Sequence, residues 1–384
     1  MSVAMRLKRT ISGIPSLAIT SGVVSRASSQ ISCPVPSGYP LAGLAIICSG
    51  TFTTLGSAMS ADGIFALFKN ITLRRNSTVN PVPINISGPG AVEYAEKVLP
   101  SLDRNTLLEI TKSPSNIATP ALAPTNYTAG DTFRFVIPLI ASRCDSTDLL
   151  HLATAVPLHL DGKDATLEMT IASDADMGLT SGTAKLSSLK VSVVAYQLLT
   201  PAALLSKLAQ DHGVAGGDVS AANGFLEWVL QEQSDTFASA KGDAFVQLPS
   251  RLQITSTLIR PYDTATNLKK DPTDTTGTGF WELKIDQNTL ETFLLGDLEA
   301  ENDQTGSTAI VGAKQPQFPY SYHRDFMSPY GNPAAELGSL LNTDLAPGIP
   351  VGFKFPCTAT SVVKTVVHGF KNRDAVNTWR YIKQ

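Results

Sequence analysis

The stretch FRFVIPLIASRCDSTDLLHLATAVPLHLDGKDATLEMTIAS (residues 133–173), with LKVSVVAYQLLTP (residues 189–201) after it, decides the fold class. Every second residue at its start is large and apolar, namely Phe133, Phe135, Ile137 and Leu139. Further along, Leu167, Met169 and Ile171 alternate with Thr166, Glu168 and Thr170. A period of two is typical of a β-strand with one buried face. We therefore predict strands over 133–141, 165–172 and 189–198, and a helix that Thr200 caps and Pro201 begins.

The rest of the chain repeats this pattern in short apolar runs separated by turns rich in Gly, Pro, Asn and Ser. These runs predict further strands over 41–53, 65–75, 82–87, 244–259, 280–285, 308–313, 351–355 and 361–370. Helical spacing interrupts them after Thr200, again at 225–230, and at 332–341, where Asn332 caps and Pro333 begins a short helix. Many short strands between turns indicate an all-β sandwich or barrel. The 28 Gly and 24 Pro have no period, which excludes a collagen-like chain.

The order of these elements resembles the double jelly-roll major capsid proteins of tailless, membrane-containing icosahedral phages, the tectivirus and adenovirus-hexon lineage. The resemblance is carried by residues 133–201, where a strand with Ile137-Pro138-Leu139 near its end precedes the segment STDLL (146–150). Weaker support comes from residues 65–88 and from LAPGIPVGFKF (345–355), and the element order is similar over residues 40–370. The resemblance implies an all-β fold of two tandem eight-stranded jelly rolls joined by a short helical connector.

On this interpretation the 384-residue chain has five parts. They are a basic N-terminal arm (1–40), a first jelly roll (41–199), a helical connector (200–243), a second jelly roll (244–370) and a basic C-terminal arm (371–384). The first 30 residues are basic and Ser-rich like a transit peptide, but Gly13 and Pro15 interrupt any apolar core, so we expect a retained arm.

Charge is distributed unevenly along the chain, although the net charge is only −3. No acidic residue precedes Asp62, whereas residues 271–303 contain nine acidic residues and a single base, Lys284. The basic termini are either solvated tails or contacts to a membrane or to neighbouring capsomers, where each cation contributes about 1 kcal/mol against an anionic surface. The contact hypothesis names Arg6, Lys8, Arg9, Arg26, Lys371, Arg373, Arg380 and Lys383.

The resemblance also implies a function. We expect a major capsid protein, and no enzyme, whose trimers form pseudo-hexameric capsomers that tile an icosahedral shell over an internal membrane. The expected partners are other copies of the chain, neighbouring capsomers, penton and minor capsid proteins and anionic membrane lipids, with no specific nucleic acid. Its expected location is the virion, after synthesis in the host cytoplasm. The long stretches 88–130 and 286–330 are candidates for outer or intersubunit loops.

Two alternatives remain open. One is a carbohydrate-binding or glycan-hydrolysing β-sandwich, which would need opposed carboxylates in a cleft lined with aromatic residues. Aromatic residues make up only 7% of the chain, and the three Trp residues are scattered. The other is a minor capsid or spike protein with similar domains.

Motifs for catalysis or cofactor binding do not occur in the sequence: there is no P-loop, dinucleotide fingerprint, nucleophile elbow or zinc-protease helix. We therefore predict no catalytic residue, no cofactor and no metal, with a structural Ca²⁺ as an open alternative. The residues considered for an ion are His151 with His159, Asp174 with Asp176, Asp271 with Asp274, and the series Glu299, Glu301 and Asp303.

The remaining polar and sulfur positions receive structural interpretations. Asn70, Asn76, Asn85 and Asn126 each begin an N-x-[ST] triplet, but without a convincing signal peptide we expect ordinary strand and turn residues. Cys33, Cys48, Cys144 and Cys357 lie far apart in the sequence, and we expect buried thiols rather than a disulfide framework.

Overall fold

The computed structural model describes the parts of the chain given in the next sentence. The described residues are 6–13, 17–26, 29–55, 62–77, 80–98, 108–111, 129–140, 155–174, 177, 182–199, 226–239, 241–264, 281–293, 322–325, 341–343, 349–357 and 361–372. The chain divides into two compact units, and the division falls within one strand, between Trp228 and Val229. Each unit is described by itself below.

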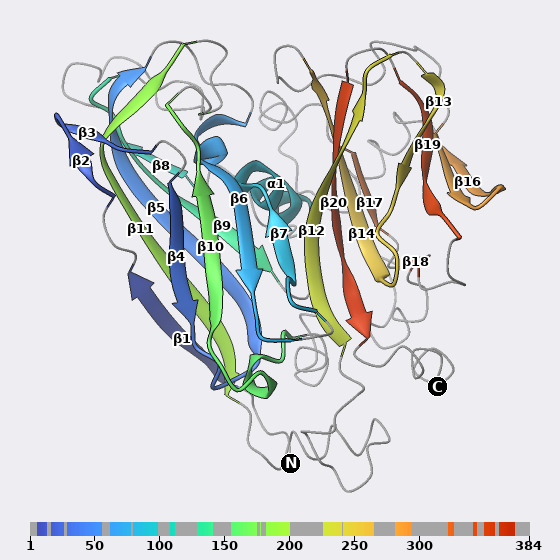
Figure 1. Cartoon of the computed structure of the whole chain (residues 1–384), viewed down its shortest axis with the longest axis horizontal. Helices are drawn as coiled ribbons and strands as arrows, with labels where there is room; N and C mark the ends of the chain where they lie inside the picture. The colour runs from blue at the N-terminus through green and yellow to red at the C-terminus, as the bar shows by residue number, and fades with distance from the viewer. Residues whose placement is uncertain are drawn as a thin grey trace, which may run out of the picture. The chain divides into compact units, whose positions relative to one another are not determined.

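The first unit contains one sheet of five strands in the order β1-β11-β5-β9-β8 (Figure 1). The bounds of these strands are β1 Arg6–Gly13, β11 Ala184–Leu199, β5 Leu41–Leu55, β9 Thr132–Ile140 and β8 Leu108–Thr111. All neighbouring pairs are antiparallel. The two longest strands, β5 and β11, pair along almost their whole length, with shifts of register at irregular points.

The second sheet of this unit has the order β4-β10-β6-β7. Its strands are β4 Gln30–Val35, β10 Ala165–Ile171, β6 Phe68–Arg74 and β7 Ile84–Ile86. Alternating burial along β4 and β10 turns Ile31, Cys33 and Val35, with Leu167 and Met169, to the interior. A two-stranded ribbon (β2 Ile19–Thr20, β3 Val23–Val24), helix α1 (Gly88–Val98) and the short 3-10 helices η1 (Gly63–Leu67) and η3 (Leu158–Leu160) lie in the connections.

The connectivity of these strands defines the architecture. With β8 and the β2–β3 ribbon set aside, the eight strands in chain order are β1, β4, β5, β6, β7, β9, β10 and β11. One sheet then contains the first, eighth, third and sixth strands, and the other contains the second, seventh, fourth and fifth. This arrangement of two four-stranded sheets is a jelly roll.

The second unit has the same connectivity. Its strands are β12 Leu226–Phe237, β13 Lys241–Gln247, β14 Gln253–Asp263, β15 Trp281–Ile285, β16 Asn288–Phe293, β17 Tyr322–Asp325, β18 Leu341–Asn342, β19 Val351–Cys357 and β20 Ser361–Asn372. One sheet has the order β17-β14-β20-β12 and the other β13-β19-β15-β16, while β18 pairs with β14. With β18 set aside, these are again strands six, three, eight and one, and strands two, seven, four and five. The chain is therefore a double jelly roll.

Aromatic side chains fill the core of the first unit. Phe135 of β9 packs edge-on against Phe65 (5.3 Å between ring centroids) and Phe68 (6.0 Å). Phe133 lies 5.1 Å from Phe52 and stacks on Phe135. These five rings are at most 3% exposed. Because Phe52, Phe133 and Phe135 come from one sheet and Phe68 from the other, this cluster joins the two layers of the sandwich.

The core of the second unit centres on Trp281. Its ring stacks on Phe355 with 4.0 Å between centroids and an interplanar angle of 8°, and Phe293 and Phe353 surround it at 6.4 and 6.5 Å. Large apolar side chains from β14 and β20, among them Ile254, Ile259 and Val367, belong to the same cluster. This cluster packs between strands of the second unit, as the aromatic cluster around Phe135 does between strands of the first.

The predicted alternation of β9 and β10 is confirmed. All four apolar residues of β9 named above are buried, and Leu167, Met169 and Ile171 are buried while Thr166, Glu168 and Thr170 are partly exposed. The strands predicted over 41–53, 82–87, 280–285, 351–355 and 361–370 correspond to β5, β7, β15, β19 and β20. Most of the strand predicted over 65–75 is β6, preceded by η1.

The basic N-terminal arm predicted over 1–40 needs correction, because it contains two strands of the first jelly roll. Residues 6–13 form β1, which pairs with β11 over its full length from Arg6↔Leu199 to Gly13↔Ser192. Residues 30–35 form β4, which pairs with β10. The charges of β1 obscured its strand character, because an edge strand with polar residues lacks the apolar alternation on which the prediction depended.

The predicted connector 200–243 also needs correction. The second helical segment predicted at 225–230 is the start of strand β12, and Trp228, Val229 and Leu230 are all buried. A short apolar run is compatible with either a buried strand or a helix, so periodicity alone misassigned it. The strand predicted over 244–259 is two strands, β13 and β14, separated at 248–252. The helix predicted after Thr200, the strand over 308–313 and residues 332–340 lie outside the described residues.

Gly352 of β19 gives a test of how closely β13 and β19 approach each other. A Cβ at this position would meet the carbonyl oxygen of Val246 and lie 2.8 Å from Cζ of Phe245. We expect Gly352→Ala to lower the free energy of unfolding by about 1–3 kcal/mol, as overpacking does in other cores. The measurement is chemical denaturation followed by tryptophan fluorescence.

The matched control is Gly242→Ala in the neighbouring strand β13, where a Cβ would have nothing within 4 Å. We expect this variant to unfold within about 0.5 kcal/mol of the parent chain, as exposed substitutions do. Equal effects of the two substitutions would contradict the packing described for β13 and β19.

Candidate assembly surfaces

Each unit has two ends, which differ in the connections that lie there. Because successive strands run in opposite directions, the connections after strands one, three, five and seven lie at one end of the unit, and those after strands two, four and six lie at the other. We call these the loop end and the base. In the first unit the loop end comprises 14–29, 56–67, 87–131 and 172–183, and the base comprises 36–40, 75–83 and 141–164. In the second unit the loop end comprises 238–240, 264–280, 294–321 and 358–360, and the base 248–252, 286–287 and 326–350.

The loop end holds the longest connection of each unit, residues 87–131 and 294–321. The stretch 88–130, predicted as an outer or intersubunit loop, is almost the same as the first of these connections and contains α1 and β8. The stretch 286–330 is only partly a connection, because it also includes β16 and β17. Long insertions in both units therefore occur at the same end of the jelly roll.

At the base of the first unit a buried ion pair joins two connections. Arg75 Nε donates to Asp161 Oδ2 at 2.7 Å, and Arg75 Nη2 donates to Asp161 Oδ1 at 2.6 Å. Both side chains are at most 1% exposed. Arg75 Nη2 also donates to the carbonyl oxygen of Pro157, and Asn76 Nδ2 donates to that of Asp161. This bidentate geometry holds the connection after β6 against the one before β10.

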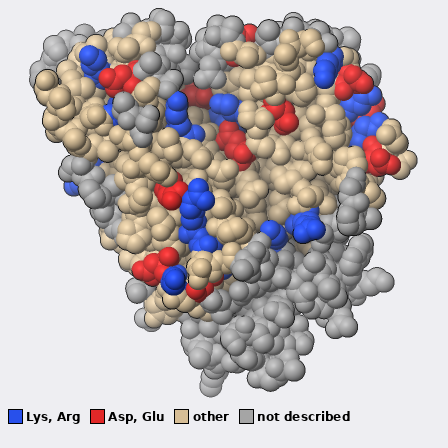
Figure 2. Space-filling view, in the orientation of Figure 1, with Lys and Arg blue, Asp and Glu red and all other residues tan. Residues whose placement is uncertain are grey.

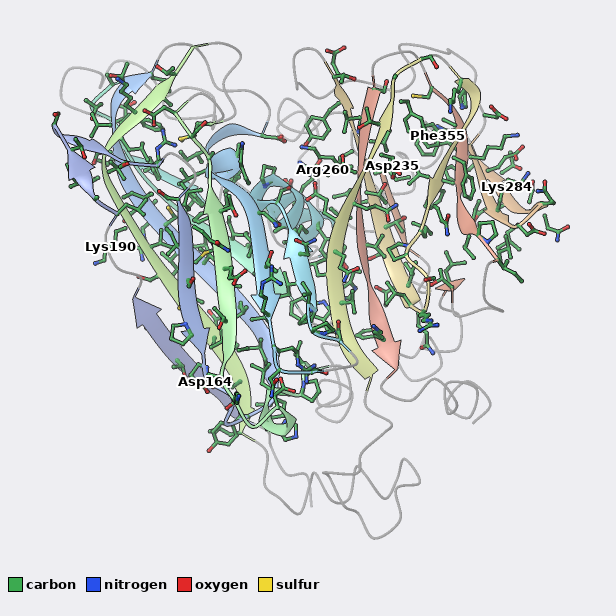
Figure 3. All side chains as sticks on the ribbon, viewed as in Figure 1. Asp164, Lys190, Asp235, Arg260, Lys284 and Phe355 are labelled. Atoms are coloured by element: carbon green, nitrogen blue, oxygen red, sulfur yellow. The ribbon has the colours of Figure 1, made fainter. Side chains whose placement is uncertain are left out.

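Further polar contacts close the base. Gln197 of β11 is fully buried and donates through Nε2 to the carbonyl oxygens of Pro36 (2.6 Å) and Tyr39 (3.3 Å). Ser37 donates to Asp164 Oδ1 through both its backbone N–H (2.9 Å) and its hydroxyl (3.0 Å). Figure 3 shows Asp164 at the lower tip of the unit, where the base connections meet. These contacts cross-link the described parts of the three base connections, residues 36–40, 75–77 with 80–83, and 155–164.

Arg26, predicted as a surface contact to a membrane or to another capsomer, is buried. Its Nη2 forms an ion pair with Asp174 at 2.7 Å and donates to the carbonyl oxygen of Ala184, and its Nη1 donates to the carbonyl oxygen of Ala172 at 3.1 Å. Burial lowers the pKa of Arg26, and Asp174 opposes this effect. Because the guanidinium joins two connections at the loop end, this residue is a structural cation and not an external contact.

The other predicted contact residues divide into two groups. Arg6, Lys8 and Arg9 lie in β1, which starts at the base of the first unit and runs to its loop end. Lys371 lies near the end of β20, where that strand reaches the base of the second unit. Arg373, Arg380 and Lys383 lie outside the described residues. The described starting point of β1 and end point of β20 are therefore both at the base of their own unit.

In the second unit the central strand β14 has no solvent-exposed face. Residues from Gln253 to Tyr262 are all buried, although they include polar side chains. Arg260 pairs with Glu232 of β12 at 3.2 Å and donates to the hydroxyl of Tyr262, and Lys364 of β20 lies 4.3 Å from the centroid of the Tyr262 ring. Figure 3 shows Arg260 on this sheet. Arg260 is therefore a buried and paired cation of the second unit.

Candidate ion ligands do not come together in the part of the chain that the structure describes, where no group of three or more His, Cys, Asp or Glu residues could hold a metal ion. Asp174 is paired with Arg26. His151, Asp176, Asp271, Asp274, Glu299, Glu301 and Asp303 lie outside the described residues. No helix among the described residues has the length and apolar character needed to cross a bilayer.

The described cysteines are buried, and Asn70 and Asn85 form hydrogen bonds within their sheet. Cys33, Cys48 and Cys357 are free and buried, and burial raises the pKa of Cys48 well above its usual value, so this thiol stays protonated. Asn70 donates to the hydroxyl of Thr72, which donates to Asn85 Oδ1, so the two amides are linked on the outer face of their sheet. Cys144 and Asn126 lie outside the described residues.

Uncharged side chains dominate the face of the described residues that is seen in Figure 2. Figure 2 shows a broad uncharged area in which Lys, Arg, Asp and Glu occur in small groups. Exposed cations include Lys185 and Lys190 on β11, and exposed large apolar residues include Ile11 of β1 and Leu290 of β16. A surface with few charges is compatible with extensive burial against other protein chains.

Comparison with solved structures identifies the same architecture elsewhere. A chain of the Sulfolobus turreted icosahedral virus matches with a TM-score of 0.63 and 13% identity, over 98% of this chain and 97% of the other. A chain of the PBCV-1 virus capsid matches with a TM-score of 0.57 and 11% identity, over 96% and 95%. The major capsid protein P2 of bacteriophage PM2 matches with a TM-score of 0.50 and 14% identity, over 96% and 99%. No protein-family model and no curated protein matches the sequence.

The base of the first unit contains two neighbouring ion pairs, Arg75–Asp161, which is buried, and Arg74–Glu168, which is exposed. Their contributions to the free energy of unfolding can be compared directly. Arg74 Nε lies 2.6 Å from Glu168 Oε2, but the Arg74 side chain is 59% exposed. We expect Arg75→Met to lower the free energy of unfolding by about 3–5 kcal/mol, because Asp161 would be left buried without its partner. For Arg74→Met we expect a loss of about 0–1 kcal/mol. Chemical denaturation of both variants measures the difference.

The double variant Arg75→Met/Asp161→Leu tests whether the loss of stability in Arg75→Met comes from the unpaired buried carboxylate of Asp161 or from altered packing. Since it leaves no unpaired buried charge, we expect it to recover most of the stability lost in Arg75→Met. A double variant as unstable as the single one would contradict this explanation.

Proposed function

We propose that this chain is the major capsid subunit of an icosahedral virus, with a structural and not a catalytic role. The observation that carries the proposal is the duplication of one eight-strand connectivity within a single chain. Chains with the same fold over almost their whole length come from a turreted icosahedral virus, from the PBCV-1 capsid and from the major capsid protein of bacteriophage PM2. A chain of two similar jelly rolls offers two similar building blocks for a shell.

The duplication supports a trimer as the assembly unit. Three copies of a two-unit chain place six jelly rolls around a threefold axis, so a trimer can occupy a site with six neighbours in a closed lattice. The contacts within such a trimer are heterologous and close on themselves. The uncharged surface supports this arrangement, because it can be buried against other copies without the cost of desolvating many charges. Neighbouring capsomers, penton and minor capsid proteins are the further partners.

We place the base of each unit toward the interior of the particle and the loop end outward. The loop ends hold the long connections, which can vary without disturbing the sheets. Strand β20 ends at the base of the second unit, and from Lys371 onward the sequence contains the cations Lys371, Arg373, Arg380 and Lys383. An anionic membrane inside the shell is the partner that fits these cations. The protein would act in the virion after folding in the host cytoplasm.

The carbohydrate-binding alternative has less support from the described residues. Trp228 and Trp281 are at most 2% exposed, and the Trp281 ring is stacked inside the core of the second unit. Neither side chain can form an aromatic sugar-binding platform on a sheet face. The minor capsid or spike alternative differs in copy number, which quantitative analysis of purified particles would measure.

The solution mass of the protein tests the capsomer directly. We expect light scattering to give about 122 kDa, three times the 40.7 kDa of one chain, with no monomer on dilution. Purified trimers should then assemble into shells when the protein is concentrated. A stable monomer at all concentrations would overturn the capsomer proposal.

The inward placement of the C-terminal segment predicts charge-dependent membrane binding. Lys371→Gln/Arg373→Gln removes two cations from each chain and should weaken binding of the trimer to anionic vesicles by at least about 30-fold, at about 1 kcal/mol for each charge near the surface. The control is Lys185→Gln/Lys190→Gln, which removes two exposed cations from β11. Vesicle co-sedimentation at low salt measures both. If both variants lose the same vesicle affinity, or if Lys371→Gln/Arg373→Gln loses none, the C-terminal segment does not bind the membrane.

A further inference from the structure

The interior of the second unit contains two threonine side chains among its apolar residues. Thr257 of β14 and Thr365 of β20 are both 0% exposed. Their strands are neighbours, with Thr257 opposite Val367 and Ile259 opposite Thr365. Because side chains alternate between the two faces of a strand, these four residues share one face. Ile259 and Val367 belong to the hydrophobic core cluster, so the two threonines face that core as well.

Neither threonine hydroxyl is satisfied by the protein. Thr257 Oγ1 and Thr365 Oγ1 have no hydrogen-bond partner among the described residues. A buried hydroxyl without a partner destabilises a protein, because it loses its hydrogen bonds to solvent and gains none in return. Buried polar groups in folded proteins are therefore nearly always paired, either with another protein group or with an ordered water molecule.

The two threonines are diagonal neighbours across the strand pair. Diagonal residues of an antiparallel pair are about 7–8 Å apart in the backbone, and their Cβ atoms are somewhat closer. A water molecule that forms hydrogen bonds of about 2.8 Å to two hydroxyls joins oxygen atoms up to about 5.6 Å apart. The register of β14 and β20 thus places both hydroxyls within reach of a single water molecule.

The first unit has apolar side chains at the corresponding place. Its third and eighth strands are β5 and β11, as β14 and β20 are in the second unit. Their core-facing pairs are Ile46 opposite Val193 and Cys48 opposite Val191, and all four side chains are buried. The hydroxyl pair is therefore a feature of the second unit and not a requirement of the jelly-roll connectivity.

We propose that Thr257 and Thr365 hold one buried water molecule in the core of the second unit. A threonine hydroxyl donates one hydrogen bond and accepts others, so the water can donate to one hydroxyl and accept from the other. Buried waters typically form two to four such bonds and are a stable part of the interior. This water joins β14 to β20 through their side chains, in addition to the backbone ladder. The site belongs to the fold of the second unit and does not depend on the proposed function.

Thr257→Val, Thr365→Val and the double variant test the site in the full chain, since valine has nearly the shape of threonine without the hydroxyl. The measurement is hydrogen–deuterium exchange of peptides from β14 and β20. Each single substitution leaves the water or the other hydroxyl without a partner, so we expect exchange protection to fall by at least about fivefold. The double variant removes both hydroxyls, and we expect its protection to lie within about twofold of the parent's.

The matched control is Val193→Thr in β11 of the first unit. It places a single hydroxyl opposite Ile46, where the neighbouring core-facing pair is apolar. We expect protection of β5 and β11 to fall by at least about fivefold, which measures the effect of one unpaired hydroxyl in this fold.

A structure of the parent chain at a resolution that shows ordered water gives the direct observation. One water within hydrogen-bond distance of both Oγ1 atoms supports the proposal. Two hydroxyls bonded to backbone carbonyl oxygens, with no water between them, overturn it. Single variants that each raise protection, with additive effects in the double variant, also overturn it, because each valine would then replace an independently unpaired hydroxyl.

Discussion

The pairing of the first strand with the last is the constraint on which each jelly roll depends. In the first unit β1 and β11 pair at every residue of β1, and in the second β12 and β20 are neighbours. These contacts join segments separated by well over a hundred residues, so the loop-closure entropy they cost must be offset by the burial of two sheets. Once the first and last strands are joined, antiparallel pairing puts alternate connections at opposite ends. The distinction between a loop end and a base follows from this pairing alone.

Buried charged side chains hold together connecting segments of the first unit that strand pairing does not join. At the base of the first unit Arg75 and Asp161 form a bidentate pair, and at its loop end Arg26 joins the connections that precede β4 and β11. In a low-dielectric interior such a cation is costly unless its donors are satisfied. The turns that provide carboxylates and carbonyl oxygens are therefore held close to these guanidinium groups. The result is a rigid scaffold from which longer connections can extend.

The same scaffold explains where assembly can occur. The sheet interiors are filled by aromatic and aliphatic side chains, and both faces of β14 are buried. What remains available is the set of edges, the base and the loop end. An edge strand retains unpaired backbone donors and acceptors, which makes it the part of a sandwich best suited to recognise another copy. A duplicated chain provides such edges twice, in two different chemical forms.

The sequence alone determined the strands whose inner face is apolar and whose outer face is polar. Phe133 to Leu139 and Leu167 to Ile171 could be assigned because alternation at period two is a local property of the chain. The basic character of the N-terminal segment was equally visible, but its role was not. Only the tertiary structure showed that residues 6–13 complete a sheet through β11, and that Arg26 is enclosed by groups about 150 residues away. The apolar run 225–230 is compatible with a helix or a strand, and pairing with neighbouring strands makes it the start of strand β12. Edge strands and buried charges depend on contacts distant in sequence, and local periodicity carries no information about which distant partner will be present.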